Sequence, residues 1–162
     1  MKQLILTRHA KSDWGGGLPD HDRPLNARGR NAAAAIGDWL RAKEYLPDAV
    51  LCSSAARTRE TLTRMQIEAP TRYDEALYHA APQTMLTVLK GAEGDSVLML
   101  GHNPGIGQLA GDLVSTPPDH PRFDAYPTAA TLVVRFDIDD WSDLALHSGQ
   151  VVDFIVPRDL TD

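Results

Sequence analysis

The sequence predicts an α/β fold, a three-layer α/β/α sandwich with a mostly parallel central sheet. Short apolar runs alternate along the chain with segments whose apolar residues recur every three to four positions, and Gly, Pro and Asp separate the two kinds of segment. Strands buried in a parallel sheet and the helices that cover it produce these two patterns in turn. The 162 residues contain no repeat, low-complexity tract or linker, so we expect a single domain spanning residues 1–162.

Five segments are predicted to be strands because each is a short apolar run that contains β-branched residues. The first, "QLILT", is a continuous apolar run, which is typical of a strand that is buried on both faces. Helical segments separate the first four strands, as a mostly parallel sheet requires. The predicted strands are residues 3–7, 49–53, 96–102, 131–138 and 149–157.

Four segments are predicted to be helices from their apolar periodicity and from the residues at their ends. Asn26 precedes the first helix as an N-cap, and Ala33, Ile36 and Leu40 lie on one face of it. Gly91 ends the third helix. The predicted helices are residues 27–45, 54–67, 83–91 and 105–114, and the longer loops between elements are residues 15–26, 69–82 and 115–127.

Charge and cysteine content narrow the classes of function. The chain carries 22 acidic and 16 basic side chains, and its formal net charge of −6 repels nucleic acid and anionic membranes. No apolar run approaches a membrane span, and Arg8 and His9 follow the first apolar residues too soon for a signal peptide. Cys52 is the one cysteine, so an intramolecular disulfide is excluded. We expect a soluble cytoplasmic domain with no nucleic-acid or membrane partner.

Basic side chains follow three of the predicted strands at the point where each strand ends. Arg8 and His9 end the first strand, Arg57 lies one turn into the helix after the second, and His102 and Asn103 follow the third. Parallel α/β sheets bind ligands at this edge, and guanidinium groups bind phosphate oxygens through paired hydrogen bonds. One such residue alone is more often structural. Two arginines and two histidines together predict a pocket for a small anion.

Three motifs in this order resemble those of the histidine phosphatase superfamily, which includes the phosphoglycerate mutases. "LTRHAKSDW" resembles the Arg-His-Gly signature of the family, "SSAARTRET" resembles its second Arg motif, and "LMLGHNPGI" resembles its second His motif. The first motif followed by "HDRPLNARG" is similar to the short phosphohistidine phosphatases of the SixA type. The resemblance covers nearly the whole chain and implies a phosphoglycerate mutase-like fold.

The resemblance also implies a phosphatase that needs no metal ion or other cofactor. His9 would be the nucleophile, and Arg8, Arg57 and His102 would bind the phosphoryl oxygens. His9 must present a neutral nitrogen, so we expect its other ring nitrogen to donate to a backbone carbonyl. The implied partner is a protein that bears phosphohistidine, such as a phosphotransfer domain in signal transduction. A small phosphorylated substrate is the alternative.

Four further residues fit the family pattern. Ser12 and Asn103 are candidates for binding phosphate or shaping the pocket, and Arg23 either shapes the pocket or holds its own loop. Glu75 lies where the larger relatives place a proton donor. Gly15 stands where mutases usually carry a phosphate-contacting Asn, which argues against mutase activity.

Other interpretations of the same residues stay open. Cys52 and Arg57 are similar to the Cys and Arg of a cysteine phosphatase loop, but they enclose four residues instead of five, and Cys52 fits a buried apolar position. The "DHD" of residues 20–22 could suggest a metal site, but no second cluster with ligand spacing accompanies it. A phosphate- or phosphopeptide-binding module without turnover and a small-molecule phosphomonoesterase are the remaining alternatives.

Overall fold

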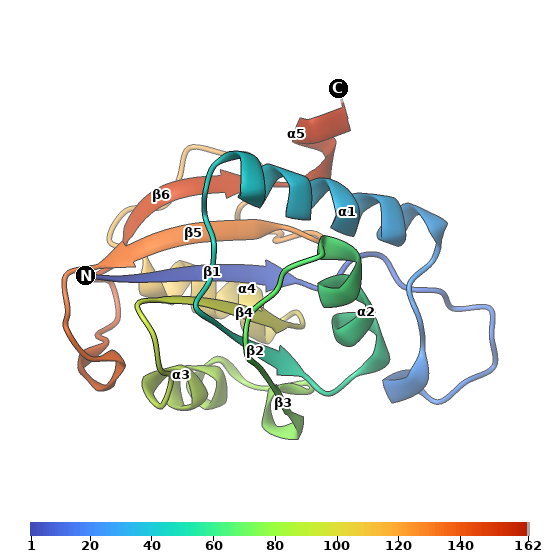
Figure 1. Cartoon of the computed structure of the whole chain (residues 1–162), viewed down its shortest axis with the longest axis horizontal. Helices are drawn as coiled ribbons and strands as arrows, with labels where there is room; N and C mark the ends of the chain where they lie inside the picture. The colour runs from blue at the N-terminus through green and yellow to red at the C-terminus, as the bar shows by residue number, and fades with distance from the viewer. Residues whose placement is uncertain (162) are drawn as a thin grey trace.

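A six-stranded mixed sheet forms the centre of the protein in a computed structural model, which describes residues 1–161 (Figure 1). The strand order is β3-β2-β4-β1-β5-β6. The strands are β1 (Lys2–Arg8), β2 (Ala49–Ser53), β3 (Thr71–Asp74), β4 (Ser96–Gly101), β5 (Thr131–Phe136) and β6 (Gln150–Ile155). Strands β1 to β4 pair in parallel, and β5 pairs antiparallel with both β1 and β6. The predicted mostly parallel sheet is confirmed.

Helices cover both faces of this sheet. The α-helices are α1 (Ala27–Ala42), α2 (Ala56–Met65), α3 (Pro82–Lys90), α4 (Gly105–Leu113) and α5 (Pro157–Thr161), and the short 3-10 helices are η1 (Asp20–Asp22), η2 (Glu75–Leu77) and η3 (Trp141–Asp143). Successive residues of β1 face opposite layers: Leu4 and Leu6 pack with α3 and α4, whereas Ile5 packs with α1 and α2. This alternation confirms the three-layer sandwich.

Two elements differ from the sequence prediction. The predicted loop at 69–82 contains β3, an edge strand whose sequence "TRYD" has no apolar run because it pairs only with β2 and is largely exposed. The last strand ends at Ile155, and Pro157 opens α5 because a proline suits the first helical position. None of the helices in the described residues has both the length and the apolar character that crossing a membrane requires.

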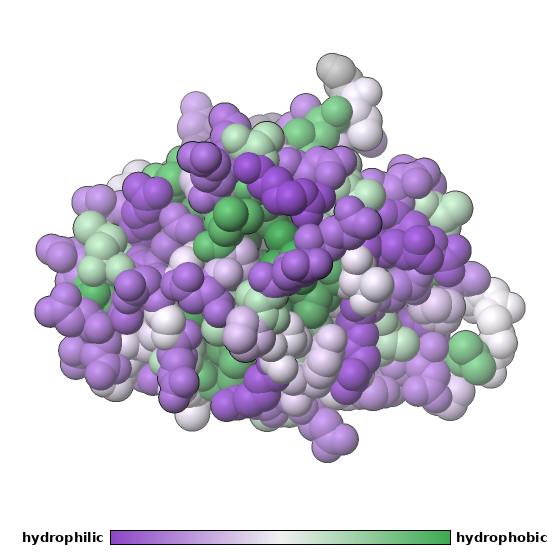
Figure 2. Space-filling model, in the orientation of Figure 1, coloured by the Kyte–Doolittle hydropathy of each residue, from purple (hydrophilic) through white to green (hydrophobic). Residues whose placement is uncertain are grey.

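The face that Figure 1 presents is mostly hydrophilic, and apolar side chains gather on it mainly beneath α1 (Figure 2). The side chain of Asn26 accepts a hydrogen bond of 2.8 Å from the backbone N–H of Gly29 and so caps α1 as predicted. Farther along, α1 crosses close to the end of α2. A Cβ added to Gly37 would lie 2.1 Å from the carbonyl oxygen of Met65, so only glycine allows this approach.

We predict opposite effects for two glycine-to-alanine substitutions in helices. Gly37→Ala should lower the free energy of unfolding by about 1–3 kcal/mol because α1 and α2 must separate. Gly111→Ala in α4, where a Cβ meets nothing within 4 Å, should raise it by about 0.5–1 kcal/mol. Urea unfolding of both variants measures the difference. Equal effects at the two positions would contradict the proposed close contact.

Candidate active site

The carboxyl ends of three neighbouring strands bring the predicted residues together. Arg8 is paired in register with Gly101, and Cys52 with Leu100, so β1, β4 and β2 end at one edge of the sheet. The side chains at this edge line a pocket of about 330 Å³. The lining residues are Arg8, His9, Lys11, Ser12, Trp14, Asp20, Arg23, Arg57, His79, His102, Asn103 and Thr128.

His9 is buried and held in one orientation by the backbone. Its Nδ1 donates to the carbonyl oxygen of Ala10 at 2.7 Å, and the N–H of Ala10 donates in turn to the Thr61 hydroxyl at 2.9 Å. A carbonyl can only accept, so the ring proton lies on Nδ1 and the lone pair of Nε2 is available. Burial chiefly, and then the guanidinium groups of Arg8 and Arg57, lower the pKa of His9 to about 3. The imidazole is therefore neutral at pH 7, as expected.

His102 lies beside His9, with the two ring centroids 5.2 Å apart. Its Nε2 forms a hydrogen bond of 2.7 Å with the Ser53 hydroxyl, which comes from the end of β2. Burial, followed by the neighbouring His9 and Arg57, lowers the pKa of His102 to about 2. The other ring nitrogen, Nδ1, is buried without a hydrogen-bond partner.

Arg57 and Arg8 also each have a buried nitrogen without a hydrogen-bond partner. Arg57 lies in the first turn of α2 with 3% of its surface exposed, and Arg8 ends β1. The Nε of each guanidinium is buried without a partner, whereas an Nη1 of each donates to a backbone carbonyl. Within residues 1–161, the two Nε atoms and His102 Nδ1 are the buried side-chain nitrogens and oxygens that lack a partner. Buried polar groups are otherwise almost always paired. The two guanidinium N–H groups therefore suit an anion in the pocket, and His102 Nδ1 joins them in the tautomer in which Ser53 donates to Nε2.

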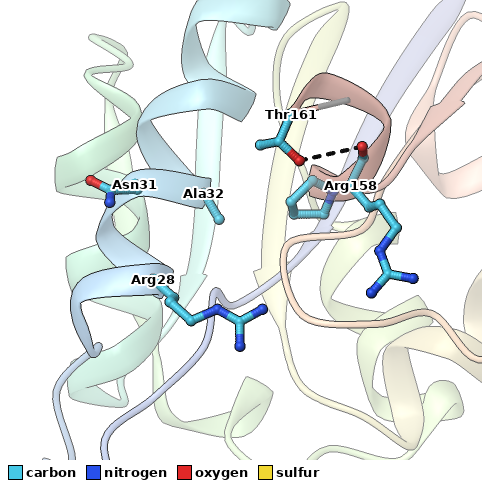
Figure 3. Close-up of a pocket in the computed structure, with 6 residues that line it drawn as sticks. Arg28, Asn31, Ala32, Arg158 and Thr161 are labelled. Atoms are coloured by element: carbon cyan, nitrogen blue, oxygen red, sulfur yellow. Dashed lines mark hydrogen bonds between the residues drawn. The ribbon is translucent and has the colours of Figure 1, made fainter.

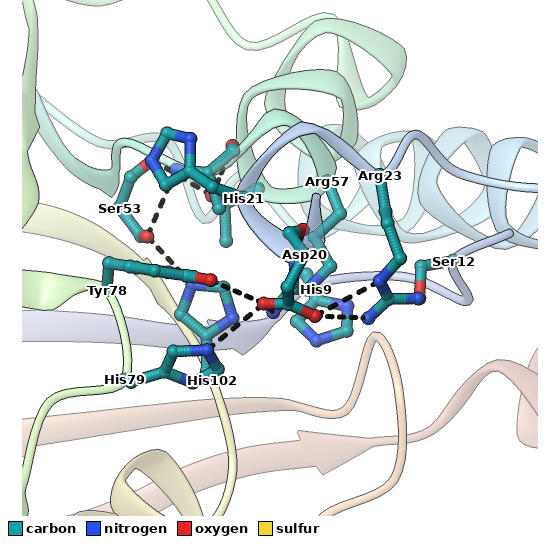
Figure 4. A network of polar contacts seen from close by, with 12 residues as sticks. His9, Ser12, Asp20, His21, Arg23, Ser53, Arg57, Tyr78, His79 and His102 are labelled. Carbon is teal, nitrogen blue, oxygen red and sulfur yellow. Dashed lines mark hydrogen bonds and ion pairs between the residues drawn. The ribbon is translucent and has the colours of Figure 1, made fainter. Parts of the chain in front are cut away.

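Asp20, which sequence reasoning did not assign to the site, lies at the centre of the polar network (Figure 4). Its Oδ2 accepts hydrogen bonds from the Tyr78 hydroxyl and from Arg57 Nη2, the latter at 3.1 Å, and lies 3.1 Å from His79 Nε2. Its Oδ1 lies 3.1 Å from Arg23 Nε. The hydrogen bond from Tyr78, and after it those from Arg57 and Arg23, hold the pKa of this carboxyl well below its usual range. Asp20 is therefore ionised at neutral pH and counters the arginine charge.

Arg23 both lines the pocket and holds its own loop, which covers the two roles that the sequence suggested. Its Nη1 donates to the Ser12 hydroxyl at 2.8 Å, and its guanidinium carbon lies 3.5 Å from the ring centre of Trp14. The Ser12 hydroxyl thus accepts from Arg23 and keeps its own proton to donate. Trp14 is 78% exposed, and its ring stacks on Arg23 at the rim of the pocket.

Asn103 and Glu75 differ in their relation to the pocket. Asn103 lines it, but its amide donates to the carbonyls of Ala125 and Tyr126 and accepts from Gly107, so its polar atoms already hold the local backbone. Glu75 opens η2, is exposed, and is not among the residues that line the pocket.

Cys52 lies in the core and not in the pocket. Its thiol is fully buried, its Sγ donates to the carbonyl of Ser53, and burial raises its pKa to about 12. A protonated thiol is a poor nucleophile, so the cysteine mechanism is not supported. Across residues 1–161, no three His, Cys, Asp or Glu side chains are grouped so that they could hold a metal ion.

Comparisons with known proteins agree with this geometry. A family model described as the histidine phosphatase superfamily (branch 1) matches residues 4–79. A candidate phosphohistidine phosphatase SixA from Nakamurella multipartitia, of solved structure, is 33% identical, with 96% of each chain covered and a TM-score of 0.83. The chain belongs to the histidine phosphatase superfamily. An uncharacterized protein of Mycobacterium tuberculosis is 41% identical to the present chain over 159 residues, which cover 93% of this chain and 99% of the relative.

A second solved structure, of a candidate phosphohistidine phosphatase SixA from Agrobacterium tumefaciens, is 29% identical. It covers 96% of this chain and 99% of its own, with a TM-score of 0.78. The phosphoglycerate mutase-like fold predicted from the motifs is therefore confirmed, and the protein is a phosphatase of the hydrolase class.

We predict that His9 and His102 make the stability of the phosphatase depend on pH. Below pH 6.5 the unfolded chain takes up protons on these histidines that the folded chain excludes, so unfolding becomes more favourable as the pH falls. Each histidine should contribute about 1.2 kcal/mol of lost stability between pH 7 and pH 5.5. Unfolding by guanidinium in phosphate-free buffer measures this loss. Between pH 7 and pH 5.5, His102→Gln should lose less free energy of unfolding than wild type, by about 1.2 kcal/mol. An identical pH dependence in the two proteins would contradict the prediction.

Proposed function

We propose that this phosphatase hydrolyses phosphohistidine in a protein through a covalent phosphohistidine intermediate on His9. One observation carries the proposal: a neutral imidazole with an available Nε2 shares a pocket with three buried nitrogens that lack partners. Phosphoryl transfer depends mainly on positioning and on electrostatic stabilisation of the phosphoryl oxygens. The arrangement supplies both, and the proposed chemistry uses no metal ion or other cofactor.

In the first step, the Nε2 lone pair of His9 attacks phosphorus and forms a P–N bond. The bond between phosphorus and the substrate imidazole breaks, and its electron pair remains on the substrate nitrogen. The Nε groups of Arg8 and Arg57 donate to the phosphoryl oxygens, and His102 Nδ1 faces the same group. The hydrogen bond from His9 Nδ1 to Ala10 stabilises the imidazolium character that develops as the new bond forms.

In the second step, a water molecule attacks phosphorus, and the P–N bond to His9 breaks. The electron pair returns to Nε2, inorganic phosphate leaves, and the proton of the water passes to the phosphate or to solvent. Dividing one displacement into two lowers each barrier, and the same donors serve both steps. The neutral His9 is regenerated unchanged.

The choice of phosphohistidine over a phosphate ester rests on the proton supply. An ester expels an alkoxide, which needs a proton as it leaves, whereas imidazole accepts a proton with a pKa near about 6.5 and leaves with little help. Asp20, the one carboxylate among the described residues that line the pocket, is held ionised and cannot donate a proton. Glu75 is exposed outside the lining. This site therefore favours a leaving group that needs no general acid.

Replacing the nucleophile tests the mechanism. His9→Ala should lower turnover of a phosphohistidine protein by at least about a thousandfold, because the activated nucleophile is lost. Wild-type enzyme quenched during turnover of a radiolabelled phosphohistidine protein should carry a label that acid removes and base does not. Label on another side chain, or retained activity in His9→Ala, would exclude the mechanism.

A matched histidine substitution provides the control. His147 lies in the loop between η3 and β6 with a φ of 59°, a conformation that asparagine tolerates. His147→Asn should retain activity and labelling. This result would show that the loss of an arbitrary histidine does not abolish turnover or the covalent label.

Substitution of Glu75 separates the substrate classes. Glu75→Gln should keep hydrolysis of a phosphohistidine protein within about a factor of ten of wild type, less than a general acid usually contributes. Hydrolysis of an alkyl phosphomonoester should be slow in both proteins. Fast wild-type turnover of the ester that collapses in Glu75→Gln would instead assign Glu75 as the acid and indicate a small-molecule phosphomonoesterase.

A further inference from the structure

A groove lined by arginines lies between the start of α1 and α5 (Figure 3). It has a volume of about 360 Å³, and Arg28 of α1 faces it together with Arg158 of α5. A second hollow of about 180 Å³ shares Arg28 and Arg158 and adds Arg122. Both hollows belong to the surface, because the three arginines are exposed.

The second hollow lies between the arginine groove and the pocket that contains His9 and shares lining residues with both. Thr128 lines both this hollow and the pocket that contains His9. The two hollows and the pocket therefore adjoin one another, in a series that extends from His9 to α5. A substrate longer than one phosphoryl group can occupy it along its length.

The three groove arginines differ from the other arginines of the protein in their contacts. Within residues 1–161, the guanidinium groups of Arg28, Arg122 and Arg158 form no hydrogen bond or ion pair, and every other arginine forms at least one. The paired arginines are Arg8, Arg23, Arg30, Arg41, Arg57, Arg59, Arg64, Arg72 and Arg135. A cluster of unpaired positive charge is unexpected in a chain of net charge −6, because acidic side chains outnumber basic ones.

We propose that this groove binds an acidic segment of the phosphoprotein substrate, adjacent to its phosphohistidine. The proposal rests on the proposed function and specifies the partner: a protein that carries several Asp or Glu side chains beside the modified histidine. Guanidinium groups bind carboxylates through paired hydrogen bonds, and three of them in succession match a run of carboxylates better than one compact anion. Charges at the rim of an interface mainly accelerate encounter and select partners. The groove therefore contributes to substrate choice and leaves the chemical step at His9 unchanged.

Charge reversal in the groove tests the proposal, with phosphohistidine peptides as probes. One peptide carries four Glu residues beside the phosphohistidine, and a matched peptide carries four Gln residues. Wild-type kcat/KM should be about five- to twentyfold higher for the Glu peptide at low ionic strength, and added salt should reduce the preference. The double variant Arg28→Glu/Arg158→Glu should lose or reverse the preference, while turnover of free phosphohistidine stays at the wild-type value.

A double variant with the same change in net charge provides the control. Lys43 follows the C-terminal end of α1, and Lys90 ends α3 shortly before β4 begins at the edge of the sheet opposite the pocket. Lys43→Glu/Lys90→Glu should keep the preference for the Glu peptide. A preference that survives in the groove variant, or is lost equally in the control, would overturn the proposal.

A binding measurement separates this inference from the proposed function. If wild type hydrolyses neither free phosphohistidine nor the phosphohistidine peptides, the proposed function is wrong. The groove is still tested by fluorescence anisotropy with Glu and Gln peptides that carry a non-hydrolysable phosphonate analogue of phosphohistidine. Tighter binding of the Glu peptide by wild type and not by Arg28→Glu/Arg158→Glu would support the acidic-segment site, and equal binding of the two peptides would refute it.

Discussion

The active site depends on the Asp20 carboxylate, which makes it possible to bury several arginines at one edge of the sheet. Arg57 and Arg23 are almost fully buried in the same pocket as Arg8, and like charges in a low-dielectric setting repel strongly. Asp20 accepts from both Arg57 and Arg23, and its backbone carbonyl also accepts from Arg57. These bonds use the Nη groups of Arg57 and leave its buried Nε without a hydrogen-bond partner. One carboxylate thus offsets part of the positive charge and orients Arg57 and Arg23.

The same burial favours His9 over Cys52 as the proposed nucleophile. Excluding water lowers the pKa of His9 to about 3 and raises the pKa of Cys52 to about 12. The imidazole is therefore neutral with a free lone pair, and the thiol keeps its proton. In the proposed function, charge within the pocket and charge outside it have different roles: the pocket arginines bind the phosphoryl group, and the groove arginines bind the rest of the substrate.

Much of the fold could be predicted because its signals are local. The run "QLILT" and the cap at Asn26 specify a buried strand and a helix start from neighbouring residues alone, and both predictions are confirmed. The strand β3 could not be predicted because "TRYD" has little intrinsic signal, and its backbone pairs with β2 only once the sheet has formed. Similarly, the close approach of Gly37 to Met65 joins two helices and leaves no trace in either segment.

For the site, the sequence by itself determined which basic residues gather, since Arg8, His9, Arg57 and His102 each follow a strand whose carboxyl end lies at a common edge. It also determined the family, through the order of the motifs. Only the tertiary structure decided the partners of those residues. Asp20 reaches Tyr78 across 58 positions, and His102 reaches Ser53 across 49 positions, so these contacts depend on how β2, β4 and two loops meet. Protonation states, unpaired nitrogens and the arginine groove arise from that packing, because burial and charge are properties of the assembled neighbourhood and not of any one segment.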